Sequence, residues 1–175
     1  MSITEASPPT QAAVVVTDAN VVINFIHAGM LADLPAMVNM TFILTDEVYE
    51  EIIRAEQRQI LDATLAAGTW TRESMIDPGA IALFATLAVV MGRGEASSLA
   101  LAVTRRCLVA SDERRVFLRE ARQRLGEGRI VDTPGLLLLA IRRGTLTVAD
   151  ADRAKALLET RSFKMKFRSF ADLLG

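Results

Sequence analysis

The sequence is poor in the side chains that build thiolate, disulfide or histidine sites. Its 175 residues contain one cysteine, Cys107, and one histidine, His27. A single cysteine excludes a disulfide framework and a four-ligand zinc site, and it fits a reducing compartment such as the cytoplasm. Cys107 stands in an apolar run, where we expect a small buried hydrophobic side chain. His27 is interpreted as a helix-end residue, which leaves no base for a nucleophilic serine or cysteine.

Long hydrophobic runs are also absent. The longest apolar segment, residues 80–91, is too short to cross a bilayer, and the first residues lack the basic segment of a signal peptide. We therefore expect a cytoplasmic protein with no membrane partner. Its expected organisation is a flexible leader over residues 1–12 and a single domain over residues 13–175. The composition, 51% hydrophobic and 23% charged, is that of an ordinary globular domain.

Positive charge is scarce in the first part of the chain. Residues 1–104 carry 12 acidic and four basic side chains, a net charge of −8, whereas residues 105–175 carry nine acidic and 16 basic ones, a net charge of +7. Such asymmetry indicates an anionic partner. Basic side chains on solvated helix faces would give the same count, so both interpretations stay open.

Short β-branched runs alternate with longer helical stretches. The expected strands are residues 14–16, 42–44, 69–71, 107–110 and 129–131, with 69–71 at a sheet edge. The expected helices are residues 20–28, 46–66, 78–90, 95–105, 112–125, 134–143 and 148–160. This alternation predicts an α/β fold with three layers, α/β/α, around a mainly parallel sheet of four to five strands. The segment 162–175 is interpreted as a closing helix, or as a strand and a helix.

Three helix starts have recognisable signals. Thr45 is the expected N-cap of the helix after the second strand, with acidic residues in the first turn. Ser111 or Asp112 is expected to cap the helix after the strand at 107–110. Pro134 suits the first turn of the helix that follows the last strand.

Acidic side chains follow two of the expected strands. Asp18 comes after the strand at 14–16, and Asp112 comes after the strand at 107–110. In an open parallel sheet, ligands bind beyond the carboxyl ends of the strands, so we expect both carboxylates in one crevice. Crowded carboxylates raise one another's pKa. A hard divalent cation such as Mg²⁺ or Mn²⁺ relieves that repulsion and prefers oxygen ligands.

Two further acids lie on helices that can face the same crevice. Glu51 lies on the helix after the second strand, and Glu95 opens a helix after Gly-Arg-Gly. These glycines let the backbone turn sharply and leave room for a close ligand. An acid in a first helical turn is also favoured by the helix dipole alone, so this structural interpretation of Glu95 stays open.

The order of these fragments resembles that of a PIN domain. The fragments are strand–Asp-x-Asn at 18–20, helix–Glu-Ile at 51–52, Gly-x-Gly-Glu-x-x-x-Leu-Ala at 92–100 and strand–Ser-Asp at 111–112. The likeness extends from Val14 to Gly144. Its end, IVDTPGLLLLAIRRGTLT, is similar to a PIN subgroup in which a Thr-x-Gly turn leads into a leucine-rich helix. The toxin-like, VapC-type members are the ones that the chain resembles.

The resemblance implies a role for each acid. Asp18, Glu95 and Asp112 would bind the metal, and Glu51 would be a further catalytic acid. Glu50 competes with Glu51 by register, and the isoleucine after Glu51 favours the latter.

Polar residues around the acids are implied as well. Asn20 matches a small polar residue near the first aspartate, and Thr133 matches a polar residue at the last strand end. Many PIN nucleases have another aspartate a few residues after the one matched by Asp112, but here residues 113–116 read Glu-Arg-Arg-Val. Asp132, from the adjacent strand end, is a candidate to fill that gap.

The implied activity is metal-assisted hydrolysis of RNA phosphodiesters by one or two Mg²⁺ or Mn²⁺ ions, leaving a 5′-phosphate and a 3′-hydroxyl. A toxin of this type implies an antitoxin that blocks the acidic crevice and docks an amphipathic helix in a hydrophobic groove. The helix at 80–91 and Met30, Met37 and Met40 are candidates for that groove or for a homodimer face. Plain core packing is the other interpretation.

Two other functions are compatible with parts of the sequence. A phosphatase with Asp18 as nucleophile needs a second aspartate where Asn20 stands, and it needs a lysine, yet the first lysine is Lys155. A non-catalytic PIN-like scaffold would bind RNA or a protein without metal. Divalent metal at the acidic cluster separates the nuclease from the scaffold.

Overall fold

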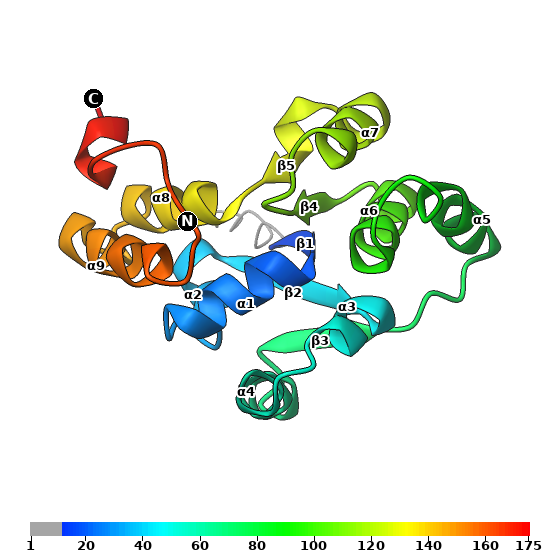
Figure 1. Cartoon of the computed structure of the whole chain (residues 1–175), viewed down its shortest axis with the longest axis horizontal. Helices are drawn as coiled ribbons and strands as arrows, with labels where there is room; N and C mark the ends of the chain where they lie inside the picture. The colour runs from blue at the N-terminus through cyan, green and yellow to red at the C-terminus, as the bar shows by residue number, and fades with distance from the viewer. Residues whose placement is uncertain (1–11) are drawn as a thin grey trace, which may run out of the picture.

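The computed structural model describes residues 12–175 and builds them around one parallel sheet (Figure 1). The expected leader, apart from its last residue, lies outside the described residues. The strand order is β3-β2-β1-β4-β5, and all neighbouring pairs are parallel. The strands are β1 (Ala13–Thr17), β2 (Met40–Thr45), β3 (Trp70–Glu73), β4 (Leu108–Ala110) and β5 (Ile130–Val131). The strand expected at 69–71 is thus the edge strand β3.

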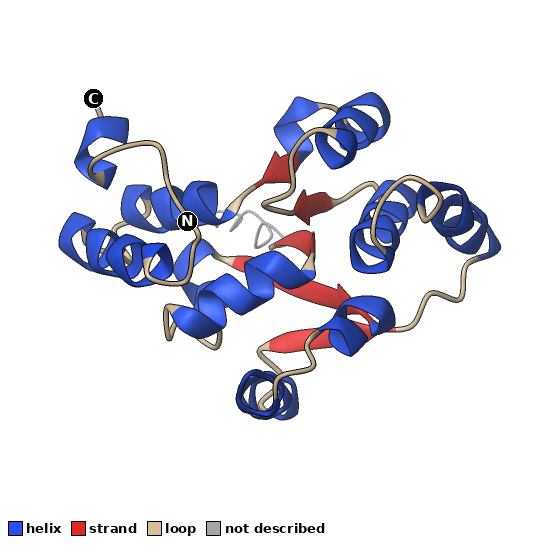
Figure 2. Cartoon of the chain, viewed as in Figure 1, coloured by secondary structure: helices blue, strands red, loops and turns tan. Residues whose placement is uncertain are grey.

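Helices cover both faces of the sheet (Figure 2). One face carries α1 (Ala19–His27), α2 (Leu34–Val38), α3 (Asp46–Glu51), α4 (Ala55–Ala66), α8 (Thr133–Arg142) and α9 (Val148–Glu159). The other face carries α5 (Pro78–Leu87), α6 (Arg93–Arg105) and α7 (Val116–Leu125). Two short 3-10 helices, η1 (Glu127–Arg129) and η2 (Phe170–Leu173), complete the described chain. The expected three-layer α/β/α fold is confirmed.

Successive side chains of the central strands β1 and β2 pack alternately into two hydrophobic cores, one on each face of the sheet. Val15 and Phe42 belong to the core under α1, whereas their neighbours Val16 and Ile43 belong to the core under α6. Successive strand residues point to opposite faces, and here both faces are covered. The strands are therefore continuous apolar runs, as parallel strands buried on both faces require.

The strand order reverses at β1, which has β2 on one side and β4 on the other. At such a switch point, a crevice forms beyond the carboxyl ends of the two adjacent strands. The residues after β1 and β4 are tied together there, because the Asp18 backbone N–H donates to the Ala110 carbonyl at 2.9 Å. The fold thus places the two strand-end aspartates at one edge of the sheet.

The helix expected over residues 46–66 is wrong, because it is two helices with a break at 52–54. Thr45 caps the first of them, as expected, by accepting from the Val48 N–H. The Arg58 side chain donates to the carbonyls of Ile52 and Tyr49. These side-chain hydrogen bonds take the place of the backbone hydrogen bonds that a continuous helix would form. The Ile52 side chain is buried at the break. The break makes Glu51 the last residue of α3.

The helix expected from residue 112 begins later, at Val116, so the expected caps at Ser111 and Asp112 are wrong. The Ser111 hydroxyl instead accepts from the Glu113 N–H at 3.1 Å, which makes a turn after β4. Arg115 has φ 46° and ψ −103°, a conformation that a helix does not contain. Residues 112–115 therefore form a loop at the crevice.

Other expectations also differ from the structure. The segment 162–175 forms neither a strand nor a full helix, only the 3-10 turn η2. The Phe170 N–H and the Ser169 hydroxyl both donate to Asp152, which holds the turn against α9. The short helix α2 was not expected, because its five residues are too few to show a hydrophobic period. Pro134 lies in the first turn of α8, as expected.

Cys107 is half-buried rather than fully buried, and it packs against the core under α6. Burial raises the pKa of its thiol, with smaller opposing effects of nearby arginines. The three methionines at 30, 37 and 40 are partly buried against the core under α1. The apolar run at 80–91 is not one buried helix, since α5 ends at Leu87 and Val89 is 83% exposed. Within residues 12–175, no helix is both long and apolar enough to span a bilayer.

Leu99 of α6 is fully buried in the core between that helix and the sheet. We expect Leu99→Ala to lower the free energy of unfolding by about 2–5 kcal/mol, because it removes buried methyl groups and leaves a cavity. Urea denaturation measures this change. Val89→Ala, at an exposed apolar position, is the control and should stay within about 0.5 kcal/mol of the wild type. Equal losses in the two variants would contradict the described core.

Candidate active site

Asp18 lies at the point where β1 passes into α1. It is the N-cap of α1, and its Oδ1 accepts from the Ala19 N–H at 2.7 Å. The Ser111 hydroxyl donates to its other oxygen at 3.2 Å. The residue is only 1% exposed. Its position is therefore fixed by the backbone of one strand end and the side chain of the next.

The surroundings of Asp18 oppose its ionisation. Burial raises the pKa of this carboxyl to about 7, and the charges of Glu95 and Glu51 add to the shift, while hydrogen bonds from Ala19 and Ser111 work against it. A carboxylate in such surroundings is stabilised by a proton or by a cation. Strong perturbation by burial and like charge is typical of functional sites.

Glu51 reaches the crevice from the end of α3. Its carboxylate accepts from the Gly94 N–H at 2.7 Å. A Cβ at position 94 would overlap that carboxylate, so only glycine permits this approach. These glycines were expected to leave space for a ligand, and at Gly94 the Glu51 carboxylate occupies that space. Glu50 lies elsewhere, 3.7 Å from the Arg72 guanidinium and exposed to solvent.

Glu95 lies in the first turn of α6. Burial raises the pKa of its carboxyl, and the charges of Glu113 and Glu51 raise it further. Gly92, the N-cap of α6, has φ −61°, so it does not use a conformation restricted to glycine. The dipole of α6 favours an acid at this place, but that effect does not explain why two further carboxylates, Glu113 and Glu51, lie near enough to shift its pKa. The crowding sets Glu95 apart from an ordinary first-turn acid.

Asp112 follows β4 and is held by three donors. Its Oδ1 accepts from the Thr133 N–H at 2.8 Å, and its Oδ2 accepts from the Thr133 hydroxyl at 2.6 Å and the Asn24 amide at 2.9 Å. Burial still raises the pKa of this carboxyl above its ordinary value. Asp112 is a rigid carboxylate, and Thr133 supports it directly.

Glu113 is a member of the acidic group that the sequence interpretation did not select. Its Oε1 accepts from the Asn20 amide at 2.7 Å, and its charge contributes to the raised pKa of Glu95. The signal was present, because Glu113 follows Asp112 directly. Only the loop geometry of residues 112–115 shows that it turns back toward α1. Asn24, one helical turn after Asn20, was also missed.

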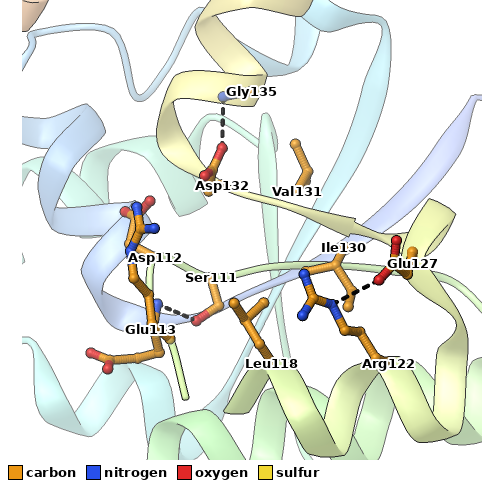
Figure 3. Close-up of a pocket in the computed structure, with 11 residues that line it drawn as sticks. Ser111, Asp112, Glu113, Leu118, Arg122, Glu127, Ile130, Val131, Asp132 and Gly135 are labelled. Atoms are coloured by element: carbon orange, nitrogen blue, oxygen red, sulfur yellow. Dashed lines mark hydrogen bonds and ion pairs between the residues drawn. The ribbon is translucent and has the colours of Figure 1, made fainter. Parts of the chain in front are cut away.

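Asp132 serves first as a helix cap. Its Oδ1 accepts from the Gly135 N–H at 2.8 Å at the start of α8, as Figure 3 shows. It lines a hollow of about 370 Å³ together with Asp112, Glu113 and Arg122. Its charge raises the pKa of Asp112, but it contributes to no pKa shift of Asp18 or Glu95. The charge of Glu113 acts on Glu95, whereas that of Asp132 acts on Asp112.

The side chains of this group are of the kind that a hard cation prefers as ligands. All are oxygen donors, which Mg²⁺ and Mn²⁺ prefer, and the buried Asp18 carboxylate lacks a basic partner among the ion pairs of the described residues. Within residues 12–175, however, no three acidic, histidine or cysteine side chains already stand in ligating positions. Cation binding therefore requires rearrangement of the longer side chains, Glu51, Glu95 or Glu113.

The raised pKa of Asp18 makes the stability of the metal-free protein depend on pH. The unfolded chain releases this proton near pKa 3.8, whereas the folded chain keeps it to about 7. Between these values the folded state binds more protons, so the free energy of unfolding falls as pH rises. Asp18→Asn cannot ionise. In EDTA at a pH of about 8, we expect it to be more stable than the wild type by up to about 4 kcal/mol.

Urea denaturation between pH of about 4 and 8 measures this difference, which should shrink toward the acidic end. Asp33→Asn, at an exposed position, controls for the loss of one charge. A stability difference that does not change with pH would contradict the buried, destabilised carboxylate.

Comparison with protein-family models matches residues 14–173 to DUF3368, described as a PIN domain. Comparisons with curated proteins and with solved structures find no match. PIN domains are generally nucleases and typically use divalent metals. The match covers nearly the whole chain and agrees with the resemblance that the strand-end acids gave. This chain belongs to the PIN-domain family.

Proposed function

We propose that the chain is a metal-dependent endoribonuclease and the toxin of a type II toxin–antitoxin pair. The observation that carries this proposal is the crowding of acids beside the rigid Asp112: the charges of Glu95 and Glu51 help to raise the pKa of Asp18, and those of Glu113 and Glu51 help to raise the pKa of Glu95. Such a group is costly without a cation and suited to one. The catalytic residues are Asp18, Glu51, Glu95 and Asp112, with Glu113 as the additional acid.

The metal would be Mg²⁺ or Mn²⁺, held by Asp18, Glu95 and Asp112. When bound, it supplies an activated water and stabilises negative charge on the phosphate. Asp18 and Asp112 contribute oxygens whose positions are fixed before binding, since hydrogen bonds from Ala19, Ser111 and Thr133 hold them. Such fixed ligands reduce the ordering needed when the substrate arrives.

The remaining residues support hydrolysis rather than a covalent intermediate. The only histidine pairs with Gln57 at 3.0 Å, so it does not activate a serine or cysteine at the acids. Lys155 pairs with Glu159 in α9, and it does not line the hollows that contain Glu95, Asp112 and Glu113. Asn20 and Asn24 hold Glu113 and Asp112, respectively. Their amides orient carboxylates and carry no proton in the reaction.

The toxin assignment adds a partner to this proposal. A protein antitoxin would place a basic side chain among the acids, where it would neutralise Asp18 in the absence of metal. Glu95, Asp112 and Glu113 line open hollows, so such a side chain can reach these acids, and its charge would act on the buried Asp18 from there. RNA as substrate and this partner rest on the family resemblance, and the test below addresses the former.

A non-catalytic scaffold is the second candidate. It is favoured by one observation, that no three acidic side chains of residues 12–175 already stand in ligating positions. A scaffold would need no divalent ion at the cluster. The two candidates therefore differ in whether metal binds and whether RNA is cut.

The first test is cleavage of a labelled RNA pool with Mg²⁺ or Mn²⁺, compared with EDTA. We expect cutting with metal, none with EDTA, and loss of cutting in Asp18→Asn and Asp112→Asn. Added Mn²⁺ should also raise the melting temperature of the wild type, since a ligand that binds only the folded state stabilises it. Metal-induced stabilisation without cutting would leave target specificity as the question. Neither effect would favour the scaffold, and full activity in Asp112→Asn would overturn the site.

Gly94→Ala tests the anchoring of Glu51. The added methyl group would displace the carboxylate, which is the far end of a flexible side chain, so the fold should persist. We expect RNA cleavage to fall by roughly 10²-fold, as a misplaced catalytic group predicts. Gly128→Ala, where an added Cβ meets nothing within 4 Å, is the matched control. Unchanged cleavage in Gly94→Ala would show that the contact between Glu51 and Gly94 is dispensable.

A further inference from the structure

Three adjoining hollows form a groove that begins at the acids and runs along α1. The first, of about 330 Å³, has Asn20, Asp112 and Glu113 in its lining. The second, of about 390 Å³, includes Glu51, and the third, of about 530 Å³, extends to Ile60 of α4. His27 and Arg161 line all three. The hollows are therefore one continuous surface, here called the α1 groove.

Three separate segments build the α1 groove. Helix α1 lies between α4 and α9 (Figure 1) and contacts both. Arg54, in the break between α3 and α4, lies on one side. Arg161, in the turn after α9, lies on the other. That turn is set by the Phe163 N–H, which donates to the Leu158 carbonyl, and by Ser162 at φ 68°.

Arg54 and Arg161 keep their charge free of internal partners. Neither takes part in an ion pair within residues 12–175, whereas Arg72, Arg105 and Arg153 each have a carboxylate partner. Both are exposed. Each lowers the pKa of His27, after the larger effect of burial, so both charges act on the same ring. Two unpaired guanidinium groups on one groove favour an anion with spaced charges.

Burial and the two nearby arginines lower the pKa of His27, which favours a neutral, flat ring over a third charge. The Gln57 amide nitrogen lies 3.0 Å from its Nε2, and because an amide nitrogen only donates, Nε2 accepts. Ile23 and Ile53 also line the groove, and Ile53 is 83% exposed. Apart from the acids at the crevice end and Glu56 in the third hollow, the lining combines two cationic side chains with apolar and ring surfaces. Single-stranded nucleic acid presents the matching pair, phosphates and bases.

We propose that the α1 groove binds the single-stranded RNA that flanks the cleaved bond, with Arg54 and Arg161 on successive backbone phosphates and a base against His27 and Ile53. This inference rests on the proposed function, because it deepens the substrate of the same site. The groove connects with the acids through Glu51 and Asp112, so a strand in it leads into the crevice. Arg54 and Arg161 are positioning residues for that strand, and they take no part in the chemistry.

The test separates binding from cleavage. Binding of a short, labelled single-stranded RNA of mixed sequence is measured by fluorescence anisotropy in EDTA, where the wild type does not cut. We expect Arg54→Gln and Arg161→Gln each to weaken binding by roughly tenfold, as loss of a charged hydrogen bond implies. The dependence of log K on log salt should flatten by about 0.7 for each variant, the value for one phosphate contact on a single strand.

Two control variants isolate the groove. Arg143→Gln removes one exposed positive charge from the end of α8, outside the residues that line the three hollows, and should leave binding and its salt dependence unchanged. Arg161→Lys keeps the charge and should retain the salt dependence of the wild type. Arg54, Arg143 and Arg161 are all exposed, so the melting temperatures of these variants should match that of the wild type.

The outcomes distinguish this inference from the proposed function. Groove-dependent binding with neither metal-dependent cutting nor metal-induced stabilisation would uphold the groove and refute the nuclease. Cutting with unchanged RNA affinity in Arg54→Gln and Arg161→Gln would uphold the nuclease and refute the groove. If both hold, the two variants should raise KM in cleavage while kcat stays near the wild-type value. An equal loss in Arg143→Gln would overturn the groove, since it would show only a general effect of charge.

Discussion

The burial of a carboxyl group at the carboxyl end of the central strand is the constraint on which the site depends. Asp18 has almost no contact with water, and burial together with two neighbouring carboxylates raises its pKa to about 7. A group with a purely structural role would gain nothing from these neighbours, because each like charge destabilises the folded state. The strand order makes the arrangement unavoidable, since the reversal at β1 brings the ends of β1 and β4 together. The buried Asp18 carboxyl is therefore stabilised either by binding a proton, which makes it neutral, or by a bound cation, which balances its negative charge.

The sequence allowed prediction of the fold and of the acids whose positions follow directly from strand ends. Asp18 and Asp112 come after apolar runs, and in a parallel sheet such residues share an edge. Glu113 was missed because its place depends on a loop in which Arg115 adopts a positive φ, and no local pattern of residues 112–116 indicates that turn. Similarly, the break after Glu51 depends on Arg58 donating to backbone carbonyls nine and six residues back in the chain. Hydrophobic period predicts where helices lie, but side chains that compete for backbone carbonyls decide where they end.

The break between α3 and α4 determines the positions of two functional side chains, Glu51 and Arg54. It ends α3 at Glu51, whose carboxylate can then rest on the Gly94 N–H, and it places Arg54 at the start of α4 on the α1 groove. A continuous helix through residues 46–66 would carry both side chains around the helix axis at fixed angles. The substitution that threatens the break, at Arg58, is therefore expected to act on the acids and the groove together. Mutations that touch neither site can still impair both through this corner.

The excess of basic side chains in the second half of the chain includes two classes, those that form ion pairs with carboxylates and those that do not. Six of the 16 basic side chains of the second half form an ion pair with a nearby carboxylate, as Arg124 does with Glu120, Arg122 with Glu127 and Lys155 with Glu159. These arginines and lysines fit the interpretation of solvated helix faces, and such exposed pairs contribute little to stability. Arg161 is one of ten basic side chains of this half that take part in no ion pair within the described residues, and it differs because it faces a groove that continues to the acids. Net charge alone could not separate these classes, since it counts paired and unpaired groups equally. The separation requires knowing which guanidinium groups lack a partner and whether they share one surface, and only the folded chain supplies both.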